Sequence, residues 1–342
     1  MTQEVDVFKL TRELIDVPSV TGDEFQVGTS LAELLTRLGY QVEMVELTTD
    51  RANVFATTGD QPRVVLSTHM DTVPPHITSS EDDEFIHGRG ACDAKGIIAA
   101  QIAAAERLRA SGVTEIGLLF TVDEEVTSAG AKAMNAHPLS SACQYLINGE
   151  PTDNRMATGT KGSLQVTIKT EGRAAHSAYP EQGVSAIERL LDVLADVRSI
   201  GWPADETFGE TTSNIGVISG GTRANVVPDE ARTVLQIRLA GQAQAAKDLL
   251  EAAVGGRAML EYKSVHDPVR LLVLDGFEQT IVRFTTDIPY LTNWGTPLLI
   301  GPGSILDAHT EHERVRKSEL LQAVEIYADL ARLLLARENH VS

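Results

Sequence analysis

The chain has 342 residues, of which 42% are hydrophobic and 23% charged, an ordinary composition for a folded protein. Lys and Arg number 29 and Asp and Glu 48, so the formal net charge is −19. Such an acidic chain is a poor partner for nucleic acid or anionic lipid, although its charge selects no function by itself. No apolar run reaches the roughly 18 residues of a membrane span, so none is expected.

Two cysteines, Cys92 and Cys143, are too few for a disulfide framework or a cysteine-rich zinc site. They agree with a reduced compartment. The first ten residues lack a basic region followed by an apolar core, so we expect no signal peptide. Both observations predict a cytoplasmic protein.

The first part of the chain alternates between helical and strand-like patterns. Apolar residues at helical spacing predict helices over 7–15, 24–38, 95–110 and 129–136. Short β-rich runs between polar turns predict strands at 42–47, 53–57, 64–68, 116–122 and 145–148. This alternation predicts an α/β fold, with a mixed sheet that carries helices on both faces.

The pattern changes near residue 162. We predict strands at 164–170, 213–218, 233–239 and 258–262, and helices over 181–200 and 243–253. Their order, β-α-β-β-α-β, is that of a ferredoxin-like sandwich. The α/β pattern then returns, with a strand at 298–300 and a closing helix over 320–335. The sequence therefore predicts a larger domain formed by 1–161 and 267–342, interrupted by an inserted domain at 162–266.

Five stretches with His or acidic residues lie at the ends of predicted strands or in the following loops, the edge at which open α/β sheets bind ligands. In the first, STHMDTVP, His69 and Asp71 point to the same side of an extended chain. His69 is a candidate metal ligand, and Asp71 is placed to hold its second ring nitrogen. Taken alone, this short pattern is also common without any function.

The second stretch, GRGACDAKG, holds Asp93 just before a helix, where capping that helix is the simpler role. Its glycines lack the GxGxxG spacing, and no strand is predicted close before it. The third, TVDEEV, places Asp123, Glu124 and Glu125 after a buried strand, where three acids are costly unless cations lie among them. One acid could bind a metal and another could act as a base, and a solvated acidic loop is the alternative.

The fourth stretch, INGEPT, and the fifth, GPGSILDAHT, each add one such residue. Together the stretches supply two imidazoles and three carboxylates, namely His69, Asp93, Glu125, Glu150 and His309, with Glu124 in addition. Such a set could hold two divalent ions about 3.5–4 Å apart, with one carboxylate bridging them. Mixed oxygen and nitrogen ligands suit Zn²⁺, with Co²⁺ or Mn²⁺ as alternatives.

In this combination the sequence resembles the co-catalytic zinc amidohydrolases, which include acetylornithine deacetylase, succinyl-diaminopimelate desuccinylase, aminoacylase and glutamate carboxypeptidase. The matching stretches keep the family's order over nearly the whole chain: SVTGDE, STHMDTVP, GRGACDAKG, TVDEE, INGEPT, AAHSAYPEQGVSAIE and GPGSILDAHT. The resemblance implies that His69 and Glu150 bind one metal ion and that Glu125 and His309 bind the other. Asp93 would bridge the two ions.

The resemblance also implies roles outside the ligand set. Asp71 would support His69, and Glu124 would be the general base that activates a metal-bridging water for attack on an amide carbonyl. The inserted domain would be a lid that mediates a homodimer. His176, in AAHSAYP, would reach the partner subunit's active site and stabilise the oxyanion.

Two further groups of residues are implied to hold the substrate. GGTRANVVP resembles a lid loop that binds the substrate carboxylate through Arg223 or Asn225. Asp287, Gly303 and Ser304 occupy positions that line the family's pocket. Turn formation is the alternative role for these three residues.

Several of the stretches look most like acetylornithine deacetylase, an enzyme of arginine biosynthesis. We therefore expect a homodimeric, metal-dependent enzyme that hydrolyses the amide bond of an N-acyl amino acid. A dipeptidase or carboxypeptidase on the same scaffold, or the desuccinylase, is the nearest alternative. A non-catalytic binding protein is a further alternative, against which the complete ligand set with Glu124 argues.

Overall fold

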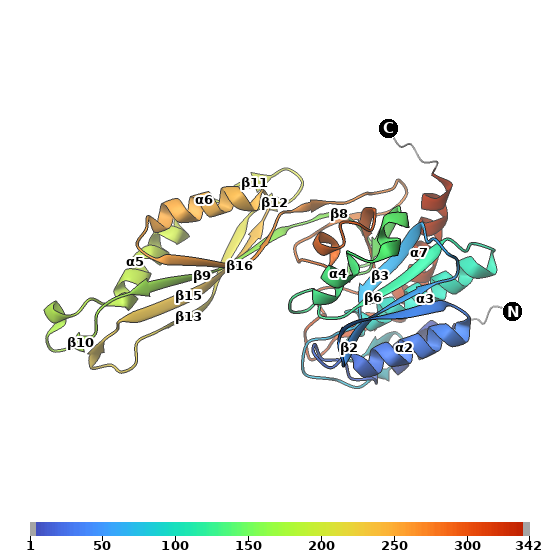
Figure 1. The fold of residues 1–342 in the computed structure, drawn as a ribbon, viewed down its shortest axis with the longest axis horizontal. Helices are drawn as coiled ribbons and strands as arrows, with labels where there is room; N and C mark the ends of the chain where they lie inside the picture. Colours follow the sequence, from blue (N-terminus) through green and yellow to red (C-terminus); the bar gives the residue numbers. More distant parts are fainter. Residues whose placement is uncertain (1–4, 338–342) are drawn as a thin grey trace. The chain divides into compact units, whose positions relative to one another are not determined.

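The computed structural model describes residues 5–337, which form two compact units (Figure 1). Of the described residues, unit 1 comprises 5–158, 271–280 and 286–337. Unit 2 comprises 159–270 and the short segment 281–285. Between residues 5 and 337, no helix is both long and apolar enough to cross a membrane.

Unit 1 is built on a six-stranded sheet of order β1-β2-β6-β3-β7-β19. Its strands are β1 (Gln41–Thr48), β2 (Arg51–Thr57), β3 (Val64–His69), β6 (Ile116–Thr121), β7 (Tyr145–Asn148) and β19 (Thr296–Leu299). The last four run parallel to one another, whereas β1 and β2 pair antiparallel. From β3 the chain passes to β6 on one side and then to β7 on the other, and ligands bind in open sheets at such a reversal.

Helices cover both faces of this sheet, as the sequence predicts. They are α1 (Val7–Ile15), α2 (Phe25–Leu38), α3 (Lys95–Ala110) and α7 (Lys317–Ala336) on one face and α4 (Ala129–Met134) on the other. Because side chains alternate along a strand, Val64 and Leu66 pack in the first core, and Val65 packs with Trp294 in the second. Both faces of the sheet are therefore buried.

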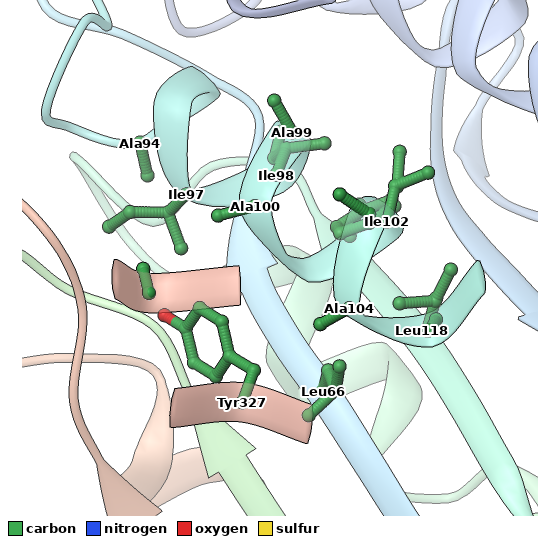
Figure 2. Packing of buried hydrophobic residues seen from close by; sticks show 14 of the residues in the cluster. Leu66, Ala94, Ile97, Ile98, Ala99, Ala100, Ile102, Ala104, Leu118 and Tyr327 are labelled. Carbon is green, nitrogen blue, oxygen red and sulfur yellow. The ribbon is translucent and has the colours of Figure 1, made fainter. Parts of the chain in front are cut away.

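The alanine-rich helix α3 lies at the centre of unit 1, with nearly all of its residues buried. Figure 2 shows its isoleucines and alanines together with Leu66 of β3 and Tyr327 of α7. The Tyr327 hydroxyl donates to the carbonyl of Ile300 at 2.8 Å, which ties α7 to the end of β19. Small side chains on α3 allow this close packing beneath the ends of the parallel strands.

Several short elements are absent from the sequence prediction. They are β4 (Ser80–Glu81), β5 (Phe85–His87) and β20 (Arg314–Arg316), which form one small sheet, and β8 (Met156–Thr160), β17 (Val269–Arg270) and β18 (Gln279–Val282), which form another. Strand β5 ends directly before Gly88. The prediction that no strand lies close before GRGACDAKG is therefore wrong, because a strand of three residues has too little pattern to be recognised.

Unit 2 follows the β-α-β-β-α-β order. Its elements are β9 (Gly162–Glu171), α5 (Ala186–Arg198), β13 (Thr212–Gly220), β15 (Glu230–Leu239), α6 (Ala243–Val254) and β16 (Met259–His266). The sheet is antiparallel, of order β13-β15-β9-β16, and both helices pack in its one buried core. The shorter pieces are β10 (Ala175–His176), β11 (Ala204–Asp205), β12 (Gly209–Glu210) and β14 (Val226–Val227).

Helix α5 begins five residues later than the predicted helix over 181–200. A 3₁₀ turn at Pro180–Gln182 and an extended Gly183 precede it. Ser185 then caps the helix by accepting a hydrogen bond from the amide of Glu188. Periodicity alone did not separate the capped helix from this turn.

Candidate metal centre

The four parallel strands of unit 1 bring their carboxyl ends to one edge, and four of the predicted stretches lie there. His69 ends β3, Glu124 and Glu125 follow β6, and Glu150 follows β7. His309 lies in the loop after β19. The remaining stretch, GRGACDAKG, carries Asp93 and connects β5 to α3.

Asp93 lies between two imidazoles. Its Oδ1 is 3.0 Å from His69 Nε2, and its Oδ2 is 3.2 Å from His309 Nε2. Nε2 of His309 is also 3.0 Å from Glu125 Oε1. Ligand atoms of His69, Asp93 and Glu125 all lie within 4.8 Å of one another. Asp93 does not cap α3, whose N-cap is Ala94, so its carboxylate is free for this arrangement.

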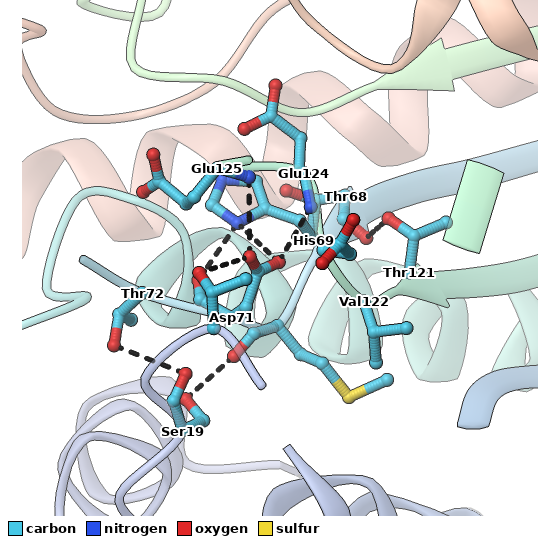
Figure 3. Close-up of polar contacts among 12 residues, drawn as sticks. Ser19, Thr68, His69, Asp71, Thr72, Thr121, Val122, Glu124 and Glu125 are labelled. Atoms are coloured by element: carbon cyan, nitrogen blue, oxygen red, sulfur yellow. Dashed lines mark hydrogen bonds and ion pairs between the residues drawn. The ribbon is translucent and has the colours of Figure 1, made fainter. Parts of the chain in front are cut away.

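Asp71 organises both the first histidine and the acidic loop (Figure 3). Its carboxylate accepts hydrogen bonds from the Thr21 hydroxyl at 2.9 Å and from the amides of Glu124 and Glu125 at 3.1 and 3.3 Å. Its backbone carbonyl lies 3.0 Å from Nδ1 of His69, and its Oδ1 lies 3.6 Å away. A proton held on Nδ1 leaves the Nε2 lone pair directed at the centre.

Asp123, the first acid of the TVDEEV stretch, has a different role from Glu124 and Glu125. Asp123 adopts a left-handed backbone conformation with φ 70°, and its carboxylate receives Arg51 Nη2 at 2.8 Å. Arg51 also binds the buried Glu24 through two hydrogen bonds of 2.6 and 2.8 Å. Asp123 thus holds the loop in place, and Glu124 and Glu125 are the acids available to the centre.

The carboxylates of the centre outnumber its two histidine side chains, so the centre has an excess of negative charge. Burial, with the charge of Glu150 added, raises the pKa of Glu124 well above its usual range. Burial likewise raises the pKa of Glu150. Hydrogen bonds to Asp93 and Glu125 raise the pKa of His309 to about 10. A cation bound beside these acids would offset the cost of burying their negative charges.

The donor set fits divalent metal ions. It combines imidazole nitrogens with carboxylate oxygens, the ligand types that Zn²⁺, Co²⁺ and Mn²⁺ accept. Oε1 of the buried Glu150 has no hydrogen-bond partner among residues 5–337. A buried carboxylate oxygen without a partner is costly, and a cation beside it would remove that cost.

The three predicted pocket residues of unit 1 differ in surroundings. Asp287 is buried, and its carboxylate accepts a hydrogen bond of 2.6 Å from the hydroxyl of Thr121 at the end of β6. Burial raises the pKa of Asp287 to about 6. Gly303 adopts φ 85° and donates its amide to Glu319, and Ser304 accepts a 3.7 Å contact from the Cys92 thiol through its carbonyl. The contacts of Gly303 and Ser304 are those of a packed turn.

The remaining predicted residues, His176, Arg223 and Asn225, belong to unit 2, where they lie close together. Strand β10 pairs His176 with Val226 of β14. The amide of Ser177 donates to the Asn225 carbonyl at 3.0 Å, and the amide of Val226 donates to the Arg223 carbonyl at 3.1 Å. All three residues are exposed.

The sequence prediction did not single out four buried or half-buried residues that hold the centre's loops, namely Glu24, Arg51, Arg89 and Glu313. Glu24 does lie within the SVTGDE stretch, although no role was assigned to it. The other three form charged pairs with residues far away in the chain. Such pairs leave no local pattern.

Comparison with known proteins identifies the family. Residues 65–333 match the model of peptidase family M20/M25/M40. A probable carboxypeptidase of Emericella nidulans is 36% identical over 378 aligned residues, which cover 96% of this chain and 89% of that protein. Two solved structures share the fold. The aminopeptidase PepT of Bacillus cereus has a TM-score of 0.79 at 23% identity, covering 98% and 99% of the two chains.

The second structure is the YXEP protein of Bacillus subtilis, described as a dinuclear metal-binding peptidase, with a TM-score of 0.71 at 15% identity over 96% and 97% of the two chains. A mixed α/β unit with an imidazole–carboxylate centre at its carboxyl edge is the architecture of the co-catalytic metallohydrolases. The chain belongs to peptidase family M20/M25/M40. It is a metal-dependent hydrolase that acts on amide bonds.

The position of Glu150 depends on the glycine before it. A Cβ atom on Gly149 would collide with Ile97 Cγ2 and would lie 2.7 Å from Gln101 Nε2 and 2.9 Å from Tyr327 Oη. We expect Gly149→Ala to lower the free energy of unfolding by about 1–3 kcal/mol, because overpacking forces side chains or backbone to shift. Because that shift would move Glu150, metal affinity should fall as well.

Denaturant unfolding and metal titration measure the two effects. Gly201→Ala is the matched control, since a Cβ atom there would meet nothing within 4 Å. The control should keep both values near those of the wild type. A Gly149→Ala protein as stable as the control would show that α3 does not restrain this strand end.

Proposed function

We propose that unit 1 binds two divalent metal ions and hydrolyses an amide whose leaving group is an amino acid with a free carboxylate. The observation that carries the two-ion assignment is the place of Asp93 between two imidazoles, with one oxygen toward each. His69 and Glu150 would bind one ion, and Glu125 and His309 the other. Asp93 would bridge them, and Zn²⁺ is the ion that best suits these ligands.

Bound ions would supply Lewis acidity, which polarises the amide carbonyl and makes water a better nucleophile. The chain's own residues supply proton transfer and orientation. Glu124, whose amide is held by Asp71, would take a proton from the attacking water and deliver it to the leaving nitrogen.

The substrate class follows from the carboxylate-binding candidates in unit 2. Arg223 and Asn225 would bind the free carboxylate of the amino acid. N-acyl amino acids, as for an acetylornithine deacetylase, and peptides cut by a carboxypeptidase or dipeptidase both present this group. The similarity to a probable carboxypeptidase supports the peptide alternative. Asp287 is the remaining pocket candidate in unit 1.

We also propose a homodimer through unit 2, with His176 acting in the partner's site. Strand β13 is the edge of its sheet, and all nine of its residues are exposed, including Ile215, Val217 and Ile218. An exposed apolar edge strand favours pairing with another strand. A second copy offers the same edge, which is the geometry of a two-fold dimer.

The test of the base is Glu124→Gln. We expect kcat to fall by about 10²–10⁴-fold, the usual contribution of a general base, while two metal ions per chain remain bound. Steady-state assays and metal analysis measure both. Glu33→Gln, a change of an exposed acid on α2, is the control and should leave kcat unchanged. A Glu124→Gln enzyme with wild-type turnover would exclude Glu124 as the base.

The test of substrate class is a hydrolysis screen of N-acetyl and N-succinyl amino acids and dipeptides, each with a free or an amidated carboxyl end. We expect cleavage only of those substrates that have a free carboxylate. Arg223→Gln should raise KM roughly 10–100-fold, because a hydrogen bond to a charged group is worth about 1.5–3 kcal/mol. Arg198→Gln, an exposed arginine of the same unit, is the control. Equal cleavage of amidated substrates would refute this substrate class.

The test of catalysis across the dimer mixes two inactive variants, His176→Ala and Glu124→Ala. Each mixed dimer should carry one site in which both residues are intact, so activity should return after mixing. Assays before and after subunit exchange measure this gain, and size-exclusion chromatography measures the dimer. Mixed dimers without activity would place His176 in its own subunit's site or outside catalysis.

A further inference from the structure

Glu313 lies where two ligand-bearing segments meet. Strand β20 pairs with β5 so that Arg314 is opposite His87, and the amide of Gly88 donates to the Glu313 carbonyl at 3.0 Å. This register places Glu313 beside the loop that leads from β5 to Asp93. Glu313 also follows His309 by only four residues.

The Glu313 carboxylate receives hydrogen bonds from three backbone amides and one guanidinium of that loop, besides a 3.7 Å contact from the Cys92 thiol. Its Oε1 accepts from the amides of Gly90 at 2.9 Å, Asp93 at 3.2 Å and Cys92 at 3.3 Å. Its Oε2 accepts from Arg89 Nη1 at 2.7 Å. The Glu313 side chain is fully buried and that of Arg89 is 3% exposed, so water does not compete for these bonds.

The loop depends on this carboxylate for its shape. Within it, the amides of Ala91 and Lys95 bond to the carbonyls of Gly88 and Gly90, but those of Gly90, Cys92 and Asp93 point inward to Glu313. Without the carboxylate these three amides and Nη1 of Arg89 would lose the partner that they have here. Buried backbone groups without a partner are rare in folded proteins because they are costly.

We propose that Glu313 is the positioning residue for the bridging carboxylate of Asp93. Glu313 accepts a hydrogen bond from the Asp93 amide, and so holds the Asp93 backbone directly. It also lies in the same segment as His309, whose Nε2 is 3.2 Å from Asp93 Oδ2. One buried side chain therefore sets the spacing between Asp93 and His309. Glu313 itself donates no atom to the centre. This inference rests on the proposed two-ion function.

A purely structural role predicts a different outcome, and the chain offers a matched control. Glu106 is also a buried acid, 3% exposed, paired with Arg109 at 2.7 Å. It lies on α3, thirteen residues after Asp93 and roughly 20 Å along the helix from it. Loss of its charge should lower stability without moving any ligand.

The experiment compares Glu313→Gln with Glu106→Gln in the full-length protein, using Co²⁺ as the probe. The glutamine amide would face Arg89, so the loop should shift. We expect Glu313→Gln to weaken Co²⁺ binding about 10–100-fold, the usual effect of losing a residue that orients metal ligands. Its visible Co²⁺ spectrum should change, and kcat should fall while KM stays constant. Glu106→Gln should lower Tm and leave the spectrum and affinity unchanged.

Glu313→Asp provides a second variant, because it keeps the charge beside Arg89 but is too short to reach all three amides. It should show a smaller loss of Co²⁺ affinity in the same direction. Wild-type Co²⁺ affinity and spectrum in either folded variant would overturn the positioning role. A wild-type protein that binds no Co²⁺ would instead overturn the proposed function on which the inference rests.

Discussion

The contact of one carboxylate, that of Asp93, with two imidazoles is the constraint on which the centre depends. His69 comes from the end of β3, His309 from the loop after β19, and Asp93 from the loop before α3. These three segments are distant in sequence and must meet within hydrogen-bond distance. Burial of the acids and their mutual repulsion oppose the arrangement, and in that order they raise the pKa of Glu124. Positive charge at this position, whether from protons or from metal ions, therefore stabilises the arrangement.

A second set of acids, which are not candidate metal ligands, holds the loops that carry the ligands. Asp71 accepts hydrogen bonds from the amides of the acidic loop, and Glu313 accepts hydrogen bonds from the amides of the Asp93 loop. Asp123 forms an ion pair with Arg51. In each case a carboxylate takes up backbone or guanidinium donors that the loop cannot satisfy internally. Such charge-assisted bonds are stronger than neutral ones, and their burial increases that strength. Acids outside the ligand set thus hold the loops around the centre in place.

The sequence predicts much of this architecture, since the main signals are local. Helix α3 and strand β7 have the predicted bounds, and parallel strands imply that stretches after them meet at one edge. The anchoring of Asp93 by Glu313 was not predictable, because the two partners in the Arg89–Glu313 pair are 224 residues apart and the strands that join them have three residues each. The sequence also did not distinguish Asp123 from its neighbours, because their roles differ only through the backbone turn at φ 70°.

In the proposed function, chemistry and recognition are divided between the two units. Every candidate metal ligand and the candidate base lie in unit 1, whereas His176, Arg223 and Asn225 lie in unit 2. Residues of unit 1 must meet strict distances, so substitutions there disturb metal binding and turnover together. If residues of unit 2 bind the substrate carboxylate as proposed, their number and spacing can vary without disturbing the metal centre. A family built in this way can keep one hydrolytic reaction while its substrates change, so the ligand set defines the reaction more narrowly than it defines the substrate.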